Sequence, residues 1–230
     1  MPADLTTIAD PLFILVAWSA GLALVAGYVS LVRVVGVGFT WLTAGTAALA
    51  ALASALSEGA IWSRIGLIGV LLGAGIARRK VGAGVVLVIS GAAFLIQAGL
   101  IGGPLAALTG SLALGGVTGE MMLGHWYLVD PRLPRWTLRS LAVGGIVGLI
   151  LDALLLGSAG GFPGGGATLA FWLLLATSIV LMVAVIAALR YPAYSGVMAA
   201  TGLSYLAVLT TLGAVFLGRA LIAGLGPFAN

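Results

Sequence analysis

The chain has 230 residues, of which 62% are hydrophobic and only 7% are charged. A soluble domain carries roughly a quarter charged residues because water must wet its surface, so this composition excludes an ordinary soluble protein. The absence of cysteine excludes disulfides, thiol catalysis and cysteine-ligated metals. The net charge of +4 comes from scattered basic residues without a basic, aromatic-rich patch, so we expect the lipid bilayer and no nucleic acid as a partner.

Eight apolar stretches follow one another along the chain. A helix needs about 20 mostly apolar residues to cross roughly 30 Å of hydrocarbon, and no stretch shows the two-residue alternation of a membrane β-strand. The sequence therefore predicts an all-α, polytopic helical bundle that forms one transmembrane domain over residues 1–230. The expected spans are 11–31, 36–57, 61–77, 82–101, 105–128, 139–157, 168–189 and 195–219.

The connections between these spans alternate in charge. Eight of the ten basic residues follow the first, third, fifth and seventh spans: Arg33, Arg78, Arg79, Lys80, Arg132, Arg135, Arg139 and Arg190. By the positive-inside rule these loops are cytoplasmic, which predicts both termini on the outer side of a prokaryotic plasma membrane. Arg64 and Arg219 fall on the other side. The leader before the first span lacks a basic stretch, so we expect no cleavable signal peptide.

Glycine recurs within the spans at small-xxx-small spacing, as in Gly115 with Gly119 and Gly144 with Gly148. Small residues let membrane helices approach closely. We expect tightly packed helices from this pattern, rather than glycine hinges.

Ionisable side chains inside a membrane are costly and are functional candidates by default. Glu120 and Asp152 are expected on neighbouring antiparallel helices, about 14 Å and 20 Å from the cytoplasmic ends of those helices. Their depths would then differ by about one helical turn, and the two acids would belong to one proton or cation pathway. The alternative is that each is a protonated acid hydrogen-bonded to a neighbouring helix. Gln97 is expected to form a structural hydrogen bond.

The segment 124–139 is the densest polar and aromatic stretch of the chain. Its side chains suit a quinone or an anionic lipid headgroup at the cytoplasmic ends of the fifth and sixth spans. The residues expected to form this site are His125, Trp126, Tyr127, Arg132, Arg135 and Arg139. The alternative is an aromatic belt with cytoplasmic basic charges.

His125 is the only histidine, which argues against a bis-histidine haem and a catalytic zinc, so no metal site is expected. Nor does the sequence assemble a set of catalytic residues, so we do not expect an enzyme on its own. No cofactor is certain; quinone or a bound lipid is the candidate.

Three functions remain open at this point. Eight helices with both termini outside resemble, in topology alone, the haem-free membrane anchors of molybdoenzyme reductases, which exchange electrons with quinol. That resemblance implies a membrane subunit of a larger redox or energy-converting complex, with other subunits as partners. The second hypothesis is a small secondary transporter or channel that uses Glu120 and Asp152, and the third is a structural or assembly protein.

Overall fold

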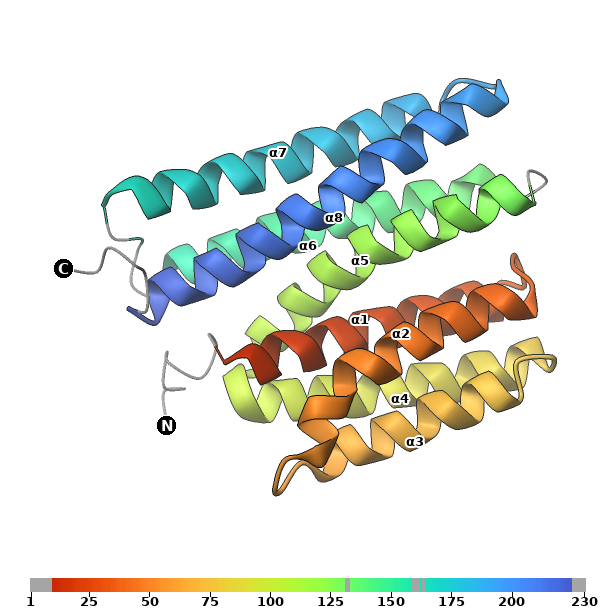
Figure 1. Cartoon of the computed structure of the whole chain (residues 1–230), viewed down its shortest axis with the longest axis horizontal. Coiled ribbons are helices and arrows are strands. Elements are labelled where there is room, and N and C mark those ends of the chain that lie inside the picture. The colour runs from red at the N-terminus through yellow and green to blue at the C-terminus, as the bar shows by residue number, and fades with distance from the viewer. Residues whose placement is uncertain (1–9, 131–132, 159–161, 163, 225–230) are drawn as a thin grey trace.

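A computed structural model describes residues 10–130, 133–158, 162 and 164–224 of the chain. Over these ranges the chain forms eight α-helices and no β-strand (Figure 1). The helices are α1 (Pro11–Leu31), α2 (Val37–Leu56), α3 (Ile61–Gly75), α4 (Lys80–Gly102), α5 (Pro104–Val129), α6 (Arg135–Ser158), α7 (Gly166–Ala188) and α8 (Tyr194–Ile222).

Six of these helices are long and apolar enough to cross a membrane: α1, α2, α4, α6, α7 and α8. α3 has only 15 residues. α5 has 26 residues but is rich in glycine, serine and threonine and contains Glu120. The prediction of an all-helical, multi-pass membrane protein is confirmed.

Local sequence explains where several helices begin. Asp10 caps α1, because its carboxylate accepts a hydrogen bond of 2.8 Å from the backbone N–H of Leu12. Pro11 occupies the first helical position, where a missing N–H costs nothing. Between α4 and α5, Gly103 adopts a φ of 88°, a conformation open to glycine, and Pro104 starts the next helix.

Two helix boundaries differ by three or more residues from the sequence-based expectation. α6 begins at Arg135 rather than at residue 139, and α8 continues past residue 219 to Ile222. The sequence-based spans stop at Arg139 and Arg219, but a long arginine side chain can lie within a helix when its guanidinium group finds partners. Arg135 donates hydrogen bonds to backbone carbonyls after α7, and Arg219 is paired inside the bundle.

Successive helices run up and down, so α1 begins and α8 ends at the same end of the bundle (Figure 1). We call this the terminal end. The opposite end, which we call the basic end, carries the connections α1–α2, α3–α4, α5–α6 and α7–α8. Seven basic residues of the described ranges lie at this end, in these connections or near the helix starts that follow them: Arg33, Arg78, Arg79, Lys80, Arg135, Arg139 and Arg190.

α5 lies in the middle of the bundle and packs against α1, α4, α6 and α8. Its glycines allow close backbone contact with two neighbours. A Cβ atom on Gly115 would lie 2.5 Å from the Cα of Gly21 in α1, and one on Gly116 would lie 2.5 Å from the backbone nitrogen of Gly145 in α6. These are the close helix contacts that the glycine spacing predicted.

Not every glycine of the pattern is a contact point. A Cβ atom on Gly148 would overlap the backbone of Ala113, whereas one on Gly144 would have only the side chain of Leu112 nearby, at 3.8 Å. Gly148 therefore lies at the α5–α6 contact, and Gly144 has free space beside it.

Candidate functional site

Asp152 of α6 and Arg219 of α8 form an ion pair near the terminal end. Nη1 of Arg219 donates to Oδ2 of Asp152 and Nη2 donates to Oδ1, both at 2.7 Å. Arg219 is fully buried and Asp152 is 3% exposed. The two parallel N–H···O bonds make this a bidentate pair, the strongest geometry that an arginine and a carboxylate form.

Side chains from two further helices complete the surroundings of the pair. The hydroxyl of Thr109 in α5 donates to Oδ1 of Asp152 at 2.6 Å. The ring of Phe13 in α1 lies 5.3 Å from the guanidinium carbon of Arg219. Gly110 leaves the space that Arg219 needs, because a Cβ atom there would lie 2.7 Å from Nη2. Four helices thus meet at one buried charge pair.

The described residues leave little room for water beside the pair. A cavity of about 10 Å³ adjoins Asp152, and its other walls are apolar side chains such as Leu149 and Phe171. A water molecule needs at least that much room and two to four polar partners, which this cavity does not supply. Nε of Arg219 has no hydrogen-bond partner among the described residues. The pair therefore acts as a neutral, fixed unit.

Glu120 lies in a different environment. Its side chain is fully buried on the face of α5 that packs against α8, and neither carboxyl oxygen has a hydrogen-bond partner within the described residues. Ser204 of α8 lies close to the carboxyl group, but its hydroxyl donates to the backbone carbonyl of Thr201 at 2.8 Å. Glu120 is thus a buried acid without the hydrogen bonds that usually offset such burial.

The two acids do not form one cluster. Asp152 is level with Thr109, which precedes Glu120 by eleven residues on α5, or about 16 Å along the helix axis. The difference in depth is about three helical turns rather than the one turn expected from the sequence. Part of the error comes from α6, which begins one turn earlier than expected and places Asp152 further from the basic end.

On α8, a further polar group lies between the levels of the two acids. Thr211 is buried on α8, and its hydroxyl has no hydrogen-bond partner among the described residues. It follows Ser204 by seven residues, which is two helical turns on the same face. Buried apolar residues, including Ala207 and Val208, occupy α8 between these positions. The α5–α8 region therefore carries polar groups at separate levels, with dry, apolar packing between them.

The aromatic residues expected to form a quinone or lipid site point to different neighbours. His125 is exposed on the bundle surface, with Nδ1 3.1 Å from the hydroxyl of Tyr205 in α8. Trp126 packs against Gly38 of α2, where an added Cβ would meet the indole ring. Tyr127 is buried, at 5% exposure. Three consecutive helical residues are about 100° apart around the axis, so they reach three different surroundings.

The arginines of the same segment bind backbone rather than form an open anion site. Arg135 donates to the carbonyls of Pro192 and Ala193, and Arg139 donates to the carbonyl of Leu189 at 2.9 Å. Both side chains therefore tie the start of α6 to the turn between α7 and α8. Arg132 lies outside the described residues. The five described residues of the expected site thus contact different neighbours.

The remaining buried polar candidate is Gln97. Gln97 of α4 is 8% exposed, and its side-chain oxygen has no partner among the described residues, so the expected structural hydrogen bond through that oxygen is not seen. Within the described ranges, no three histidine, aspartate or glutamate side chains gather as a metal-binding group.

The buried position of Arg219 and its pairing with Asp152 were not predicted from the sequence. Arg219 was counted as a charge at the outer end of the last span, although a basic residue on that side departs from the positive-inside pattern. That departure, together with an acid at comparable depth in another helix, is the signal that would have suggested the Asp152–Arg219 pair.

We found no protein-family model, curated protein or solved structure that matches the chain.

Proposed function

We propose that the chain is an eight-span membrane protein, with both termini on the outer side of a prokaryotic plasma membrane, that transfers protons through its α5–α8 region. Glu120 is the group that takes up and releases the proton. This is the transporter or channel hypothesis, with the two acids given different roles. α3 and α5 count as spans because the basic residues then fall on one side of the membrane.

The observation that carries this proposal is the unpartnered carboxyl group of Glu120. A charged carboxylate without partners in a dry interior is very costly, so the group is held neutral and must be hydrated before it can ionise. A leucine of similar size would pack there without that cost. An acid that contributes no stabilising contact in its resting state is well suited to exchange a proton when water reaches it.

Asp152 has a different role in this proposal. Its carboxylate is held by Arg219 and Thr109, so both charges are already compensated. The pair joins α6 to α8 at the terminal end and fixes the frame in which Glu120 sits. The apolar packing between the two levels closes the route in this conformation, and proton transfer requires water to enter there.

The test uses purified protein in sealed liposomes that contain a pH-sensitive dye. A potassium diffusion potential drives protons inward, and the parent protein should acidify the lumen faster than empty liposomes. Glu120→Gln should lower this rate to that of empty liposomes, because the amide keeps the shape but carries no exchangeable acid. Glu58→Gln is the matched control, since Glu58 is an exposed acid in the α2–α3 connection.

Two outcomes would contradict the proposal. One is a folded Glu120→Gln variant that conducts protons as fast as the parent. The other is a parent protein that leaves the proton permeability of the liposomes unchanged, which would favour the structural role.

A second function is favoured by the His125–Tyr205 contact. These two groups lie side by side on the surface of the bundle, where a quinone carbonyl could accept a hydrogen bond from either. In this alternative the chain is a haem-free subunit of a redox complex, in line with the topological resemblance. Purification in native membrane discs should then recover partner subunits and quinone, whereas recovery of the chain alone without quinone would refute it.

A further inference from the structure

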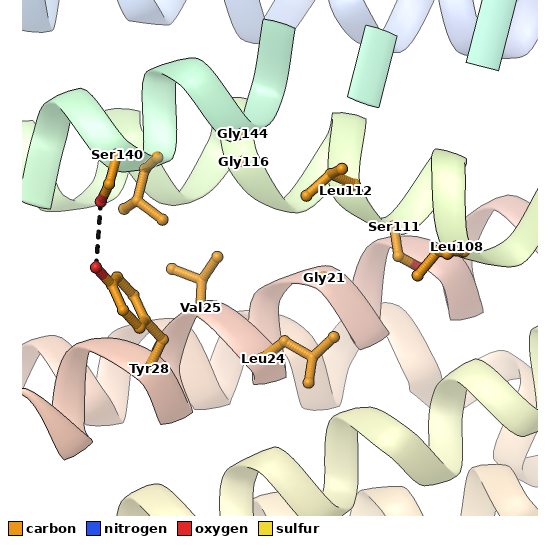
Figure 2. A pocket seen from close by; sticks show the side chains of 11 residues that line it. Gly21, Leu24, Val25, Tyr28, Leu108, Ser111, Leu112, Gly116, Ser140 and Gly144 are labelled. Atoms are coloured by element: carbon orange, nitrogen blue, oxygen red, sulfur yellow. Dashed lines mark hydrogen bonds between the residues drawn. The ribbon is translucent and has the colours of Figure 1, made fainter. Parts of the chain in front are cut away.

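A groove opens on the side of the bundle between α1 and the α5–α6 pair (Figure 2). Its volume is about 280 Å³, near the lower end of the range for small-molecule sites, roughly 300–1,000 Å³. Both α1 and α6 are among the helices apolar enough to span a membrane, so the groove lies at membrane depth and faces hydrocarbon.

The groove is open because Gly144 has no side chain to fill it, and an added Cβ there would meet only the side chain of Leu112, at 3.8 Å. The other two glycines that line it let the neighbouring helix backbones approach closely. Gly21, Gly116 and Gly144 come from α1, α5 and α6, while Leu24 and Leu112 form apolar walls. The result is a smooth slot with few polar atoms. Water would find too few hydrogen-bond partners in it, and an empty slot would forfeit the dispersion contacts of its walls.

The end of the groove nearest the basic end is polar. The hydroxyls of Tyr28 and Ser140 lie 3.3 Å apart and bridge α1 and α6, as Figure 2 shows. Tyr28 also meets the ring of Trp136 edge-on, with ring centroids 6.5 Å apart. Tyr28 precedes the end of α1 by three residues, or about 4.5 Å, which places its hydroxyl near the interfacial layer of the bilayer.

We propose that this groove binds one acyl chain of an anionic glycerophospholipid, with the ester carbonyl accepting a hydrogen bond from the hydroxyl of Tyr28. The hydroxyl of Ser140 donates to the backbone carbonyl of Thr137 at 2.8 Å, which leaves Tyr28 as the donor. The hydrocarbon chain fills the glycine-lined slot towards Leu108. The phosphate then lies beyond the end of α1, at the same end of the bundle as the exposed Arg33, which follows α1 by two residues and carries a complementary charge. The buried Ser111, whose hydroxyl lacks a partner among the described residues, lines the slot and can turn to a carbonyl of its own helix.

The length and chemistry of the slot favour an acyl lipid over an isoprenoid quinone. From Tyr28 to Gly21 it extends over seven residues of α1, about 10 Å, which suits a slender chain. A quinone head would have to occupy the polar end as a flat ring, where Tyr28 and Ser140 already meet across the groove. This site is independent of the proposed proton transfer, because Glu120 is not among the residues that line it.

The experiment uses the full chain in vesicles of phosphatidylethanolamine and phosphatidylglycerol that contain a phosphatidylglycerol with a photoactivatable diazirine in its acyl chain. After illumination, mass spectrometry locates the labelled residues. Labelling at Leu24 and Leu112 should exceed labelling at Leu154, which is 64% exposed on α6 and meets bulk lipid only.

Gly144→Leu fills the groove from within, and the space beside Gly144 allows it without backbone overlap. This variant should reduce labelling at Leu24 and Leu112 to the level at Leu154. Gly202→Leu is the matched control, because Gly202 is an exposed helical glycine of α8 with nothing within 4 Å of an added Cβ. The control should label like the parent.

A second variant keeps the proposal testable if Gly144→Leu fails to fold. Tyr28→Phe removes only the donor hydroxyl, and loss of one hydrogen bond should speed release of labelled phosphatidylglycerol about two- to tenfold. The proposal is overturned if groove labelling in the parent does not exceed that at Leu154, or if folded Gly144→Leu labels like the parent. It is also overturned if Tyr28→Phe releases the lipid at the parent rate, or if the native lipid recovered with the chain is an isoprenoid.

Discussion

Asp152 and Arg219 stand 67 positions apart in the sequence and bind each other through two hydrogen bonds of 2.7 Å inside the bundle. Neither charge would be tolerated there alone. Together they are neutral, and Thr109 adds a third hydrogen bond from the central helix. Replacing Asp152 by a neutral residue should therefore affect stability, because it leaves the buried charge of Arg219 uncompensated.

We predict that Asp152→Asn destabilises the protein strongly. The change leaves the fully buried Arg219 without a counter-charge, and breaking a buried ion pair from one side costs about 3–5 kcal/mol. The thermal midpoint in a mild detergent should fall well below that of the parent. Arg190→Met, at an exposed arginine of the basic end, should change stability by no more than about 0.5 kcal/mol.

The double variant Asp152→Leu with Arg219→Met separates a lost charge partner from lost packing. Removing both charges also removes the cost of burying them, so most of the stability lost in the single variant should return. Melting curves of the parent, Asp152→Leu, Arg219→Met and the double variant form a complete double-mutant cycle. Additive losses would mean that the pair does not hold the helices together through its charges.

Glu120 should respond in the opposite way. Its carboxyl oxygens have no partners among the described residues, so Glu120→Leu removes a buried polar group without breaking a hydrogen bond. Stability in detergent should stay equal to that of the parent or rise, by up to roughly 1–3 kcal/mol. A fall of that size would show that the carboxyl makes a stabilising contact, and would remove the main support for its role as an exchanging acid.

Gly144 and Gly148 of α6 should differ in their tolerance of a larger side chain, although they lie one helical turn apart. Gly148→Leu forces a side chain into the backbone of Ala113 and should abolish the folded bundle or lower its melting temperature sharply. Gly119→Leu should also destabilise, since a Cβ there would lie 2.6 Å from a methyl carbon of Val25. Gly144→Leu, on the groove side, should melt close to the Gly202→Leu control. Equal melting of all four variants would contradict the observed contacts.

The orientation of the bundle can be tested with single cysteines, because the parent has none. Cysteine in place of Arg79 or Tyr191 should react with a membrane-impermeant maleimide only after the cells are opened, because positive loops remain in the cytoplasm. Cysteine in place of Glu58 should react in intact cells. The reverse pattern would refute the proposed orientation.

The sequence predicted the helical architecture well because hydrophobic length depends only on composition along the chain. It predicted the position of Asp152 less well, because helix boundaries were drawn at charged residues and α6 extends through Arg135. The ion pair with Arg219 depends on which helices lie side by side at the terminal end. No local pattern in the sequence contains that information.

The expected quinone or lipid site shows a second reason why the sequence-based prediction and the structure differ. The expected site includes three consecutive residues, His125, Trp126 and Tyr127, and their closeness in the sequence suggests a common site. On a helix, neighbours in sequence point in different directions, so His125 meets Tyr205 while Trp126 meets Gly38. The groove at Tyr28 and Ser140 was not expected, since its walls come from three separate helices.

The short helix α3 has a consequence for the surrounding membrane. Its 15 residues extend only about 22 Å, less than the roughly 30 Å of hydrocarbon in a typical bilayer. Arg64, in its first turn, reaches back to the carbonyls of Ala55 and Ser57 and holds a cation at that edge. In the proposed eight-span arrangement, lipids beside α3 therefore compress, while those beside the longer α7 need not. Such one-sided hydrophobic mismatch favours residence in thin membranes and promotes association with neighbouring proteins on the α3 side.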